Sequence, residues 1–407
     1  MTDLVTNAQL VLLARTLHVP VERLAHLERI GAAALHELQQ RMAAVIFAQH
    51  AATFERISKL VPVIPLSISI PLVQRLVPPM MTGRAAGAVG VKYPKKAADA
   101  VWMLEPGYAA DCAPYLDPHT VGQLADVAPP EPIVRITNEV LRRGDYVTAG
   151  PFLAYATPAL IRAIEAGVAD DEGLIRSAAY AYSGENLSGV MRQLLHGRSH
   201  RIPQMVATVL DGSAELQLAA LSVFARCDSD VVGAVGELMF EFGSTEAITA
   251  MLGTVIDAGS IPELLRFAGS LRPSALDSLG ANPIVGDDAR MSALVAALEG
   301  ADEPALWRGL LCWIERADFQ VQRRIAALIT DLTDPTLLAV PGAATEARIW
   351  PALLRLLAEA DVDTQALLGE VWALLTPSVR ADLQRRVSDL RLDSRLATLS
   401  VTLDIYA

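Results

Sequence analysis

The best-spaced pair of metal-ligand side chains in the chain is His196 and His200, in the segment LLHGRSHRIP. Residues four apart lie on one face of a helix, which is the spacing that two histidine ligands of one zinc ion use. However, Gly197 and Pro203 predict that a helix ends inside this segment, and no third ligand follows nearby. The sequence therefore predicts no metal site.

Adjacent acidic residues occur at Asp170-Asp171-Glu172 and at Asp287-Asp288, each group beside a glycine. Acid–base catalysis by two carboxyl groups needs side chains from separate elements that converge in a cleft. Acids are also common in the first turn of a helix, where they favour the free backbone amides. We interpret both groups as solvated acids at helix starts.

Cysteines and glycines give no sign of chemistry either. Cys112, Cys227 and Cys312 are odd in number, and more than 80 residues separate each from the next. This excludes a disulfide framework or zinc knuckle, so we expect buried, small apolar side chains. The glycines of TGRAAGAVGVK lack GxGxxG spacing, and the chain contains no GxSxG or HExxH. We expect no catalytic residue, no cofactor and no enzymatic activity.

Prolines indicate which elements the chain builds. In MLEPGYAADCAPYLDPHTVGQLADVAPPEP, prolines recur every twelve residues, at 106, 118 and 130. Proline is favoured at the first position of a helix, and Asp or Thr before it is a good N-cap. The pairs Glu105-Pro106, Asp117-Pro118, Thr157-Pro158, Glu303-Pro304, Asp334-Pro335 and Thr376-Pro377 therefore predict helix starts.

The residues three and six positions after the early prolines are all apolar, which places them on one helix face. Each twelve-residue unit is then a helix of about eight to ten residues with a tight turn, too short to be stable alone. Neighbours must hold such helices, as in a solenoid. This predicts that four side chains are buried against adjacent helices: Leu124, Ile133, Ile136 and Ile164.

Downstream, segments such as SAELQLAALSVFARCD and EPALWRGLLCWIERAD predict helices of about sixteen residues. The predicted fold class is all-α, an α-solenoid of short helices followed by longer helical hairpins. We expect three regions: a basic, apolar N-terminal segment at 1–96, short-helix superhelical repeats at 97–200, and a C-terminal helical-repeat region at 201–407.

Residues 60–96 combine apolar content with positive charge. The stretch from Leu60 to Val91 contains five prolines and too few uninterrupted apolar residues for a spanning helix, so we expect one or two short helices. Either this stretch is buried packing, or it docks on a membrane or a partner. In the second case the docking residues are Arg75, Arg84, Lys92, Lys95 and Lys96.

Charge is unevenly distributed along the 407-residue chain. Residues 1–96 hold eleven Lys and Arg against five Asp and Glu, a net +6, which leaves −18 for the rest of a chain at −12. The basic residues are dispersed and no reader motif is present, so we expect no nucleic-acid partner. A composition that is 52% hydrophobic excludes disorder. The first twenty residues lack the features of a secretory signal, so we expect a cytoplasmic protein.

Residues from about 97 to 195 resemble the N-terminal α-superhelical domain of magnesium transporters of the MgtE type. The resemblance rests on WMLEP, YLDP and LADVAPPEPIVRI, in which short helices open at proline-containing turns. It implies an α-superhelix used for regulation or contacts. The regulatory pair and membrane channel of those transporters have no counterpart here, so transport is not implied and no magnesium ligand is carried over.

Two hypotheses for function follow from these observations. The first is a non-enzymatic scaffold or adaptor that binds a protein partner through its superhelical surface. The second is a lipid-associated protein. It would either dock through residues 60–96 on an anionic membrane, at the inner face, or hold a hydrophobic ligand between helices.

Overall fold

The computed structural model of the chain describes residues 4–58, 64–117, 121–197 and 201–405. These residues form α- and 3-10 helices, turns and bends, without a strand among them, so the all-α class is confirmed. Contacts divide the chain into two compact units, Met1–Asp228 and Ser229–Ala407. The three regions expected from the sequence, 1–96, 97–200 and 201–407, were defined by charge and helix length and stay a prediction.

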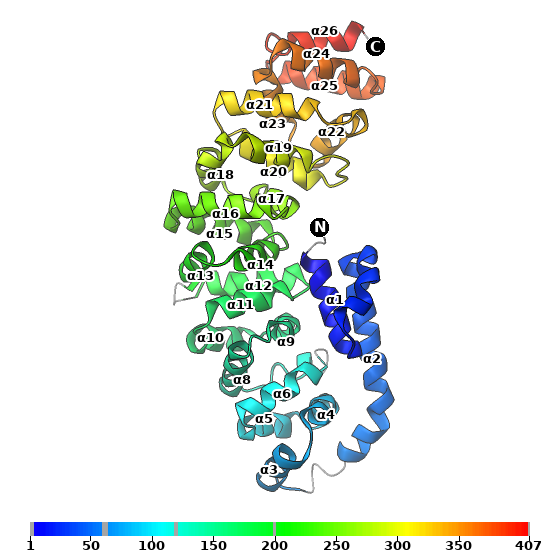
Figure 1. Cartoon of the computed structure of the whole chain (residues 1–407), viewed down its shortest axis with the longest axis vertical. Helices are drawn as coiled ribbons and strands as arrows, with labels where there is room; N and C mark the ends of the chain where they lie inside the picture. Colours follow the sequence, from blue (N-terminus) through cyan, green and yellow to red (C-terminus); the bar gives the residue numbers. More distant parts are fainter. Residues whose placement is uncertain (1–3, 59–63, 118–120, 198–200, 406–407) are drawn as a thin grey trace. The chain divides into compact units, whose positions relative to one another are not determined.

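The first unit begins with a helical hairpin followed by a row of shorter helices (Figure 1). Its elements are α1 (Leu4–Leu17), η1 (Val21–Ile30), α2 (Gly31–Ser58), α3 (Leu66–Leu76), α4 (Pro79–Lys92), α5 (Pro94–Met103), α6 (Pro106–Cys112), η2 (Ala113–Tyr115), α8 (Pro130–Arg142), α9 (Tyr146–Ala149), η3 (Gly150–Tyr155), α10 (Pro158–Gly167), α11 (Asp171–Ala179), α12 (Gly184–Leu195), α13 (Arg201–Leu210) and α14 (Ala214–Phe224).

Prolines begin helices where the sequence predicts them. α6, α8 and α10 start at Pro106, Pro130 and Pro158, while Pro118 lies outside the described residues. The residue before the proline is the weaker signal: Thr157 accepts a hydrogen bond from the Leu160 amide at 3.3 Å, but the side chain of Glu105 caps nothing. The fixed φ of proline therefore marks these starts more reliably than the cap does.

The predicted core positions of the short helices need correction. The four side chains expected to be buried, Leu124, Ile133, Ile136 and Ile164, are half-buried. The fully buried residues of the same region include Val134, Val140, Leu141 and Ile161. A short helix in a row is covered mainly by the helices before and after it. Only a few of its apolar side chains are therefore fully buried, and the others are partly exposed. Ile136 and Ile164 still pack against the margins of such clusters.

The segment from Leu60 to Val91 contains two helices, as expected, with residues 60–63 outside the described part. α3 spans eleven residues and includes Pro71 in its interior, and α4 spans fourteen. α4 packs against α2, α5 and α6 and is covered on several sides. Gly83 and Gly90 have no room for a Cβ, because Tyr115 and Leu124 lie against them.

The N-terminal hairpin of α1 and α2 packs alongside the row (Figure 1). Leu10, Leu13 and Leu35 form its own apolar core, and α1 also contacts α9, α11 and α14 far along the chain. Gly31, in the left-handed region at φ 77°, separates η1 from α2.

The second unit is a row of helices with a tryptophan-rich core. It contains α15 (Ser229–Phe242), α16 (Thr245–Asp257), α17 (Ile261–Ala268), α18 (Pro273–Gly280), η4 (Pro283–Gly286), α19 (Asp288–Ala296), α20 (Pro304–Ile314), α21 (Phe319–Thr330), α22 (Asp334–Glu346), α23 (Trp350–Glu359), α24 (Val362–Trp372), α25 (Pro377–Asp389) and α26 (Ala397–Ile405). Its principal contacts join helices no more than three α-helices apart. Trp313 and Trp372 are buried, and their indole N–H groups donate to the Leu279 and Leu337 carbonyls at 3.2 and 2.9 Å.

The longer downstream helices expected from the sequence are a wrong prediction. SAELQLAALSVFARCD gives α14 with eleven residues, and EPALWRGLLCWIERAD gives α20, also with eleven. Caps and terminal turns take up the remaining residues. Ser213, for example, lies outside α14 and accepts a hydrogen bond from the Leu216 amide.

Arginine–carboxylate pairs connect helices at a nearly constant separation along the sequence. Among the described residues, the two members of an interhelical pair are usually 30 to 40 residues apart in the sequence. The pair of Arg15 with Asp145 is an exception, with a separation of 130 residues. These pairs include Arg143–Asp111, Arg192–Asp228, Arg201–Asp171, Arg266–Glu303, Arg290–Asp257, Arg316–Asp277 and Arg355–Glu315. An exposed pair contributes only about 0.2–1 kcal/mol, so the pairs fix the register of neighbouring helices more than they stabilise them.

One of these pairs is buried. The side chain of Arg201 is 5% exposed, and its guanidinium donates to Asp171 at 2.7 Å and to the Ile164 and Glu165 carbonyls at the end of α10. The interpretation of Asp171 as a solvated acid is therefore wrong. Asp170 behaves as expected for a helix start, because it accepts a hydrogen bond from the Gly173 amide at 2.8 Å.

We predict that Arg201→Ala lowers the free energy of unfolding by about 3–5 kcal/mol, since it leaves the Asp171 carboxylate buried without its partner. Arg162→Ala removes an exposed arginine from α10 and should change it by less than about 0.5 kcal/mol. Denaturant unfolding followed by circular dichroism measures both. Equal stability of the two variants would contradict the burial of this pair.

Candidate functional site

The five basic residues expected to form a docking site differ in their exposure to solvent. Arg75 on α3, Lys92 at the end of α4 and Lys95 at the start of α5 are exposed, and Lys96 is half-buried. Arg84, in the middle of α4, instead donates to Nε2 of His18 at 2.8 Å, at the end of α1. The structure therefore separates Arg84 from the exposed members of the set.

Exposed apolar side chains concentrate on the helices that carry these basic residues. Of the nineteen large hydrophobic residues that are exposed among those the structure describes, nine lie between residues 64 and 103. Eight of them belong to three consecutive helices and define what we call the α3–α5 surface: Ile68, Leu72, Leu76, Met80, Met81, Val91, Trp102 and Met103.

On α3 these residues form a stripe. Ile68, Leu72 and Leu76 are 55%, 51% and 75% exposed. At 100° per residue they fall within about 80° of one another, and Arg75 lies about 20° outside the stripe. Such an apolar stripe normally faces the core. Here it faces away from it, with an arginine at its edge.

The position of α3 explains its exposure. Its principal contact is with α5, and it lies at the end of the row (Figure 1). Two hydrogen bonds fix its C-terminal half: Tyr108 donates to the Val77 carbonyl at 2.9 Å, and the Glu105 amide donates to Gln74 Oε1 at 2.7 Å. These bonds hold one side of α3 against the row and leave its apolar stripe uncovered.

A second candidate is a pocket of about 120 Å³ between the hairpin and the row. Its lining comes from α1, α2, α4, the 113–117 segment and the 147–152 segment, all within the first unit. Arg15, His18 and Arg84 supply its basic groups, and Leu12, Phe47 and Phe152 are among its apolar walls. No sequence pattern indicates this site, since its parts lie far apart along the chain.

His18 adopts an unusual backbone conformation at this pocket. Its φ is 55°, and the Val19 and His18 amides donate to the Ala14 and Arg15 carbonyls at 3.0 and 3.2 Å. This is the Schellman ending of a helix, in which glycine usually occupies the left-handed position. The imidazole lies 5.8 Å from the Tyr115 ring, between centroids.

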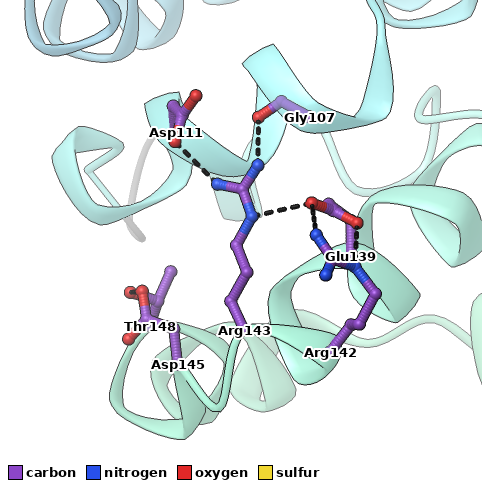
Figure 2. A network of polar contacts seen from close by, with 7 residues as sticks. All are labelled: Gly107, Asp111, Glu139, Arg142, Arg143, Asp145 and Thr148. Carbon is purple, nitrogen blue, oxygen red and sulfur yellow. Dashed lines mark hydrogen bonds and ion pairs between the residues drawn. The ribbon is translucent and has the colours of Figure 1, made fainter.

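A network of polar contacts joins adjacent helices of the row (Figure 2). Arg143 connects α6 to α8 by donating to Asp111 at 2.6 Å, to the Gly107 carbonyl at 3.0 Å and to Glu139 at 2.8 Å. Hydrogen bonds from Arg142 and Arg143 lower the pKa of Glu139 to about 2. This network holds adjacent helices together, and its charged groups are paired with one another.

Another contact between the hairpin and the row was missed by sequence reasoning. The rings of His36, on α2, and Tyr182, after α11, stack 4.0 Å apart between centroids at an interplanar angle of 9°. His36 also lies 3.0 Å from Gln9 Oε1, and burial lowers its pKa. Tyr180, two residues earlier, packs against Gly150.

The remaining candidates from the sequence show no chemistry in the described residues. Of the histidine pair, His200 lies outside them, and Nδ1 of His196 is 2.6 Å from the Arg192 carbonyl of its own helix. No group of three metal-ligating side chains occurs in the described part of the chain. Cys112 is buried, whereas Cys227 and Cys312 are only half-buried, and desolvation raises the pKa of all three thiols.

In the described ranges, no helix has both the length and the apolar character needed to cross a membrane. No protein-family model matches the chain, and no curated protein is detectably similar to it.

We predict that the Glu139 network makes folding sensitive to acid. Because the folded state lowers the pKa of Glu139 to about 2, from an ordinary value of 4.5, its contribution to stability is complete above pH 4.5 and disappears as the pH falls towards 2. Glu139→Gln should therefore lower the melting temperature at pH 7 and flatten its decline in acid.

The matched control is Glu131→Gln, which removes an exposed carboxylate from the same helix. Thermal melts between pH 7 and pH 2 compare the two variants with the wild type. If Glu139→Gln and the wild type lose stability in parallel over this range, the ion pairs of Glu139 contribute nothing to folding.

Proposed function

We propose that the protein is a non-enzymatic helical-repeat scaffold that binds a protein partner at the α3–α5 surface. The observation that carries this proposal is the exposed apolar stripe of Ile68, Leu72 and Leu76 on α3. Soluble proteins rarely leave such a stripe open unless it contacts something, and regularly spaced apolar residues suit an amphipathic helix of a partner.

The scaffold part of the proposal is that each unit is an α-solenoid. Supporting this are the short helices, the contacts between near neighbours in chain order, and ion pairs that recur at separations of 30 to 40 residues. A repeat of that length contains two or three of these helices. Solenoids need terminal repeats with a polar outer face, and an apolar outer face at a row end suits a contact surface instead.

The resemblance of residues 97–195 to the N-terminal domain of MgtE-type transporters agrees with this role. It implies a superhelix used for regulation or contacts, and in this chain the stretch begins within α5 and so overlaps the α3–α5 surface at Trp102 and Met103.

We predict that a photo-reactive amino acid at position 72 cross-links to discrete proteins in the cells that produce this chain. The control carries the same photo-reactive group in place of Val362, which is 65% exposed in the second unit. This control should give no such adducts. Leu76→Glu should abolish the adducts formed from position 72, because a carboxylate interrupts the apolar stripe. Adducts that are identical from both positions, or unaffected by Leu76→Glu, would rule out this surface as the binding site.

A second candidate function is reversible docking of the same surface on an anionic membrane. The observation that favours it is charge: no Asp or Glu occurs from residue 56 to residue 98, whereas Arg75, Lys92 and Lys95 are exposed there. Apolar insertion at the interface and attraction to anionic lipid then act together.

For this candidate we predict co-sedimentation with vesicles that increases with anionic lipid and decreases with salt. Each basic residue near the surface contributes about 1 kcal/mol, so replacing Lys92, Lys95 and Lys96 by Glu should weaken binding by at least about a hundredfold. The control replaces three exposed arginines elsewhere, Arg23, Arg29 and Arg162, by Glu. It changes the net charge by the same amount and should leave vesicle binding largely intact. A protein that stays in the supernatant at low salt with strongly anionic vesicles excludes docking and leaves the protein partner.

A further inference from the structure

The pocket between the hairpin and the row has a charged side and an apolar side. Arg15, His18 and Arg84 contribute basic groups, and Asp117 is the acidic residue in its lining. Its apolar walls are Leu12, Ile46, Phe47, Val147, Pro151 and Phe152. A volume of about 120 Å³ is close to that of cavities that bind a benzene-sized molecule, about 150 Å³. The pocket therefore has room for a small organic molecule with one polar end.

Of the two arginines in the lining, Arg84 has the unneutralised charge. Arg15 donates to Asp145 at 2.6 Å and also contacts Thr148, so its charge is paired. Arg84 makes no ion pair with a carboxylate among the described residues, and its contact there is with the imidazole of His18 at 2.8 Å. A guanidinium has five N–H donors in a planar fork that matches a carboxylate, so donors remain for a ligand.

His18 acts as the positioning residue for Arg84. A guanidinium only donates hydrogen bonds, so Nε2 of His18 is the acceptor in this contact. The chain holds this side chain at a helix end where the left-handed backbone, at φ 55°, favours glycine. Non-glycine residues in sparsely populated backbone regions are often found at ligand sites, and here the imidazole contacts Arg84.

Charge also limits which ligands fit. Arg15 is paired with Asp145, and Asp117 adds one acidic residue to the lining of the same pocket. A ligand with one negative charge is matched by the Arg84 guanidinium, whereas the second charge of a dianion such as phosphate has no unpaired arginine among the lining residues and shares the pocket with Asp117. The apolar walls need a hydrocarbon part to fill them.

We infer that this pocket is a binding site for a small organic monocarboxylate. Its carboxylate pairs with the Arg84 guanidinium, and its hydrocarbon part lies between Leu12, Phe47 and Phe152. Because the lining comes from both the hairpin and the row, the bound molecule contacts both. This inference is independent of the α3–α5 surface, which shares none of its residues with the pocket.

Calorimetric titration of the full-length protein tests the site with three probes: butyrate, its uncharged analogue butyramide, and inorganic phosphate. Butyrate should bind saturably and at least about tenfold more tightly than butyramide, because a hydrogen bond to a charged group is lost with the analogue. Phosphate should bind more weakly than butyrate. Saturable butyrate binding is not expected to change with the variants of the α3–α5 surface.

Two variants locate the binding. Arg84→Met should weaken butyrate binding at least about tenfold, whereas Arg23→Met, at an exposed position of η1 outside the pocket, should leave it unchanged. His18→Gly should weaken binding while the melting temperature stays the same or rises, because glycine suits the backbone there. A purely structural role of His18 would lower the melting temperature instead.

Several results would overturn the inference: no saturable binding of butyrate, equal binding of butyrate and butyramide, phosphate binding as tight as butyrate binding, or full binding by Arg84→Met. The comparison of butyrate with butyramide uses the wild-type protein, so the inference can fail even if a variant does not fold.

Discussion

The dependence of each short helix on its neighbours governs this molecule. Most of the helices have fewer than fifteen residues, a length at which an isolated helix is marginal in water. Their stability comes from packing on helices two or three positions away, and buried side chains such as Trp313 and Trp372 donate hydrogen bonds to backbone carbonyls 34 and 35 residues earlier. Arginine–carboxylate pairs also join residues 30 to 40 positions apart in the sequence, and they hold neighbouring helices in register.

A row of this kind has covered sides and open ends, and both candidate sites follow from that. In the first unit, the N-terminal hairpin packs on α4, α9, α11 and α14, whereas the principal contact of α3, at the end of the row, is with α5. The apolar stripe of α3 consequently stays exposed. The polar contacts of the hairpin with the row, through Arg15, His18 and His36, leave a small pocket between them. We therefore propose one surface for a macromolecule and one pocket for a small ligand.

The features that the sequence predicts correctly depend only on residues close together in the chain. Proline at the first position of a helix needs no information from distant residues, so the starts of α6, α8 and α10 follow from the chain alone. Hydrophobic spacing also indicates helices throughout. It does not tell which apolar residue faces a neighbour: Ile136 is half-buried, while Val134 on the same helix is buried.

What the sequence does not predict depends on contacts between distant segments. The neighbours of Asp171 in the sequence suggest a solvated acid, but in the structure Arg201, thirty residues later, donates a hydrogen bond to it. Arg84 resembled a docking residue, and only its contact with His18, sixty-six residues earlier, places it in a pocket. The sequence does contain arginines and acids 30 to 40 residues apart, but only the structure shows which of them pair.

The central claim is that the outer face of α3 is open in the folded protein and free to bind. Urea unfolding of the double variant Leu72→Gln/Leu76→Gln tests this most directly. If the face is open, the free energy of unfolding stays within about 0.5 kcal/mol of the wild type, as for other surface substitutions. A loss of about 2–5 kcal/mol, typical of a core, would show that these leucines are covered in the folded chain and would contradict the account.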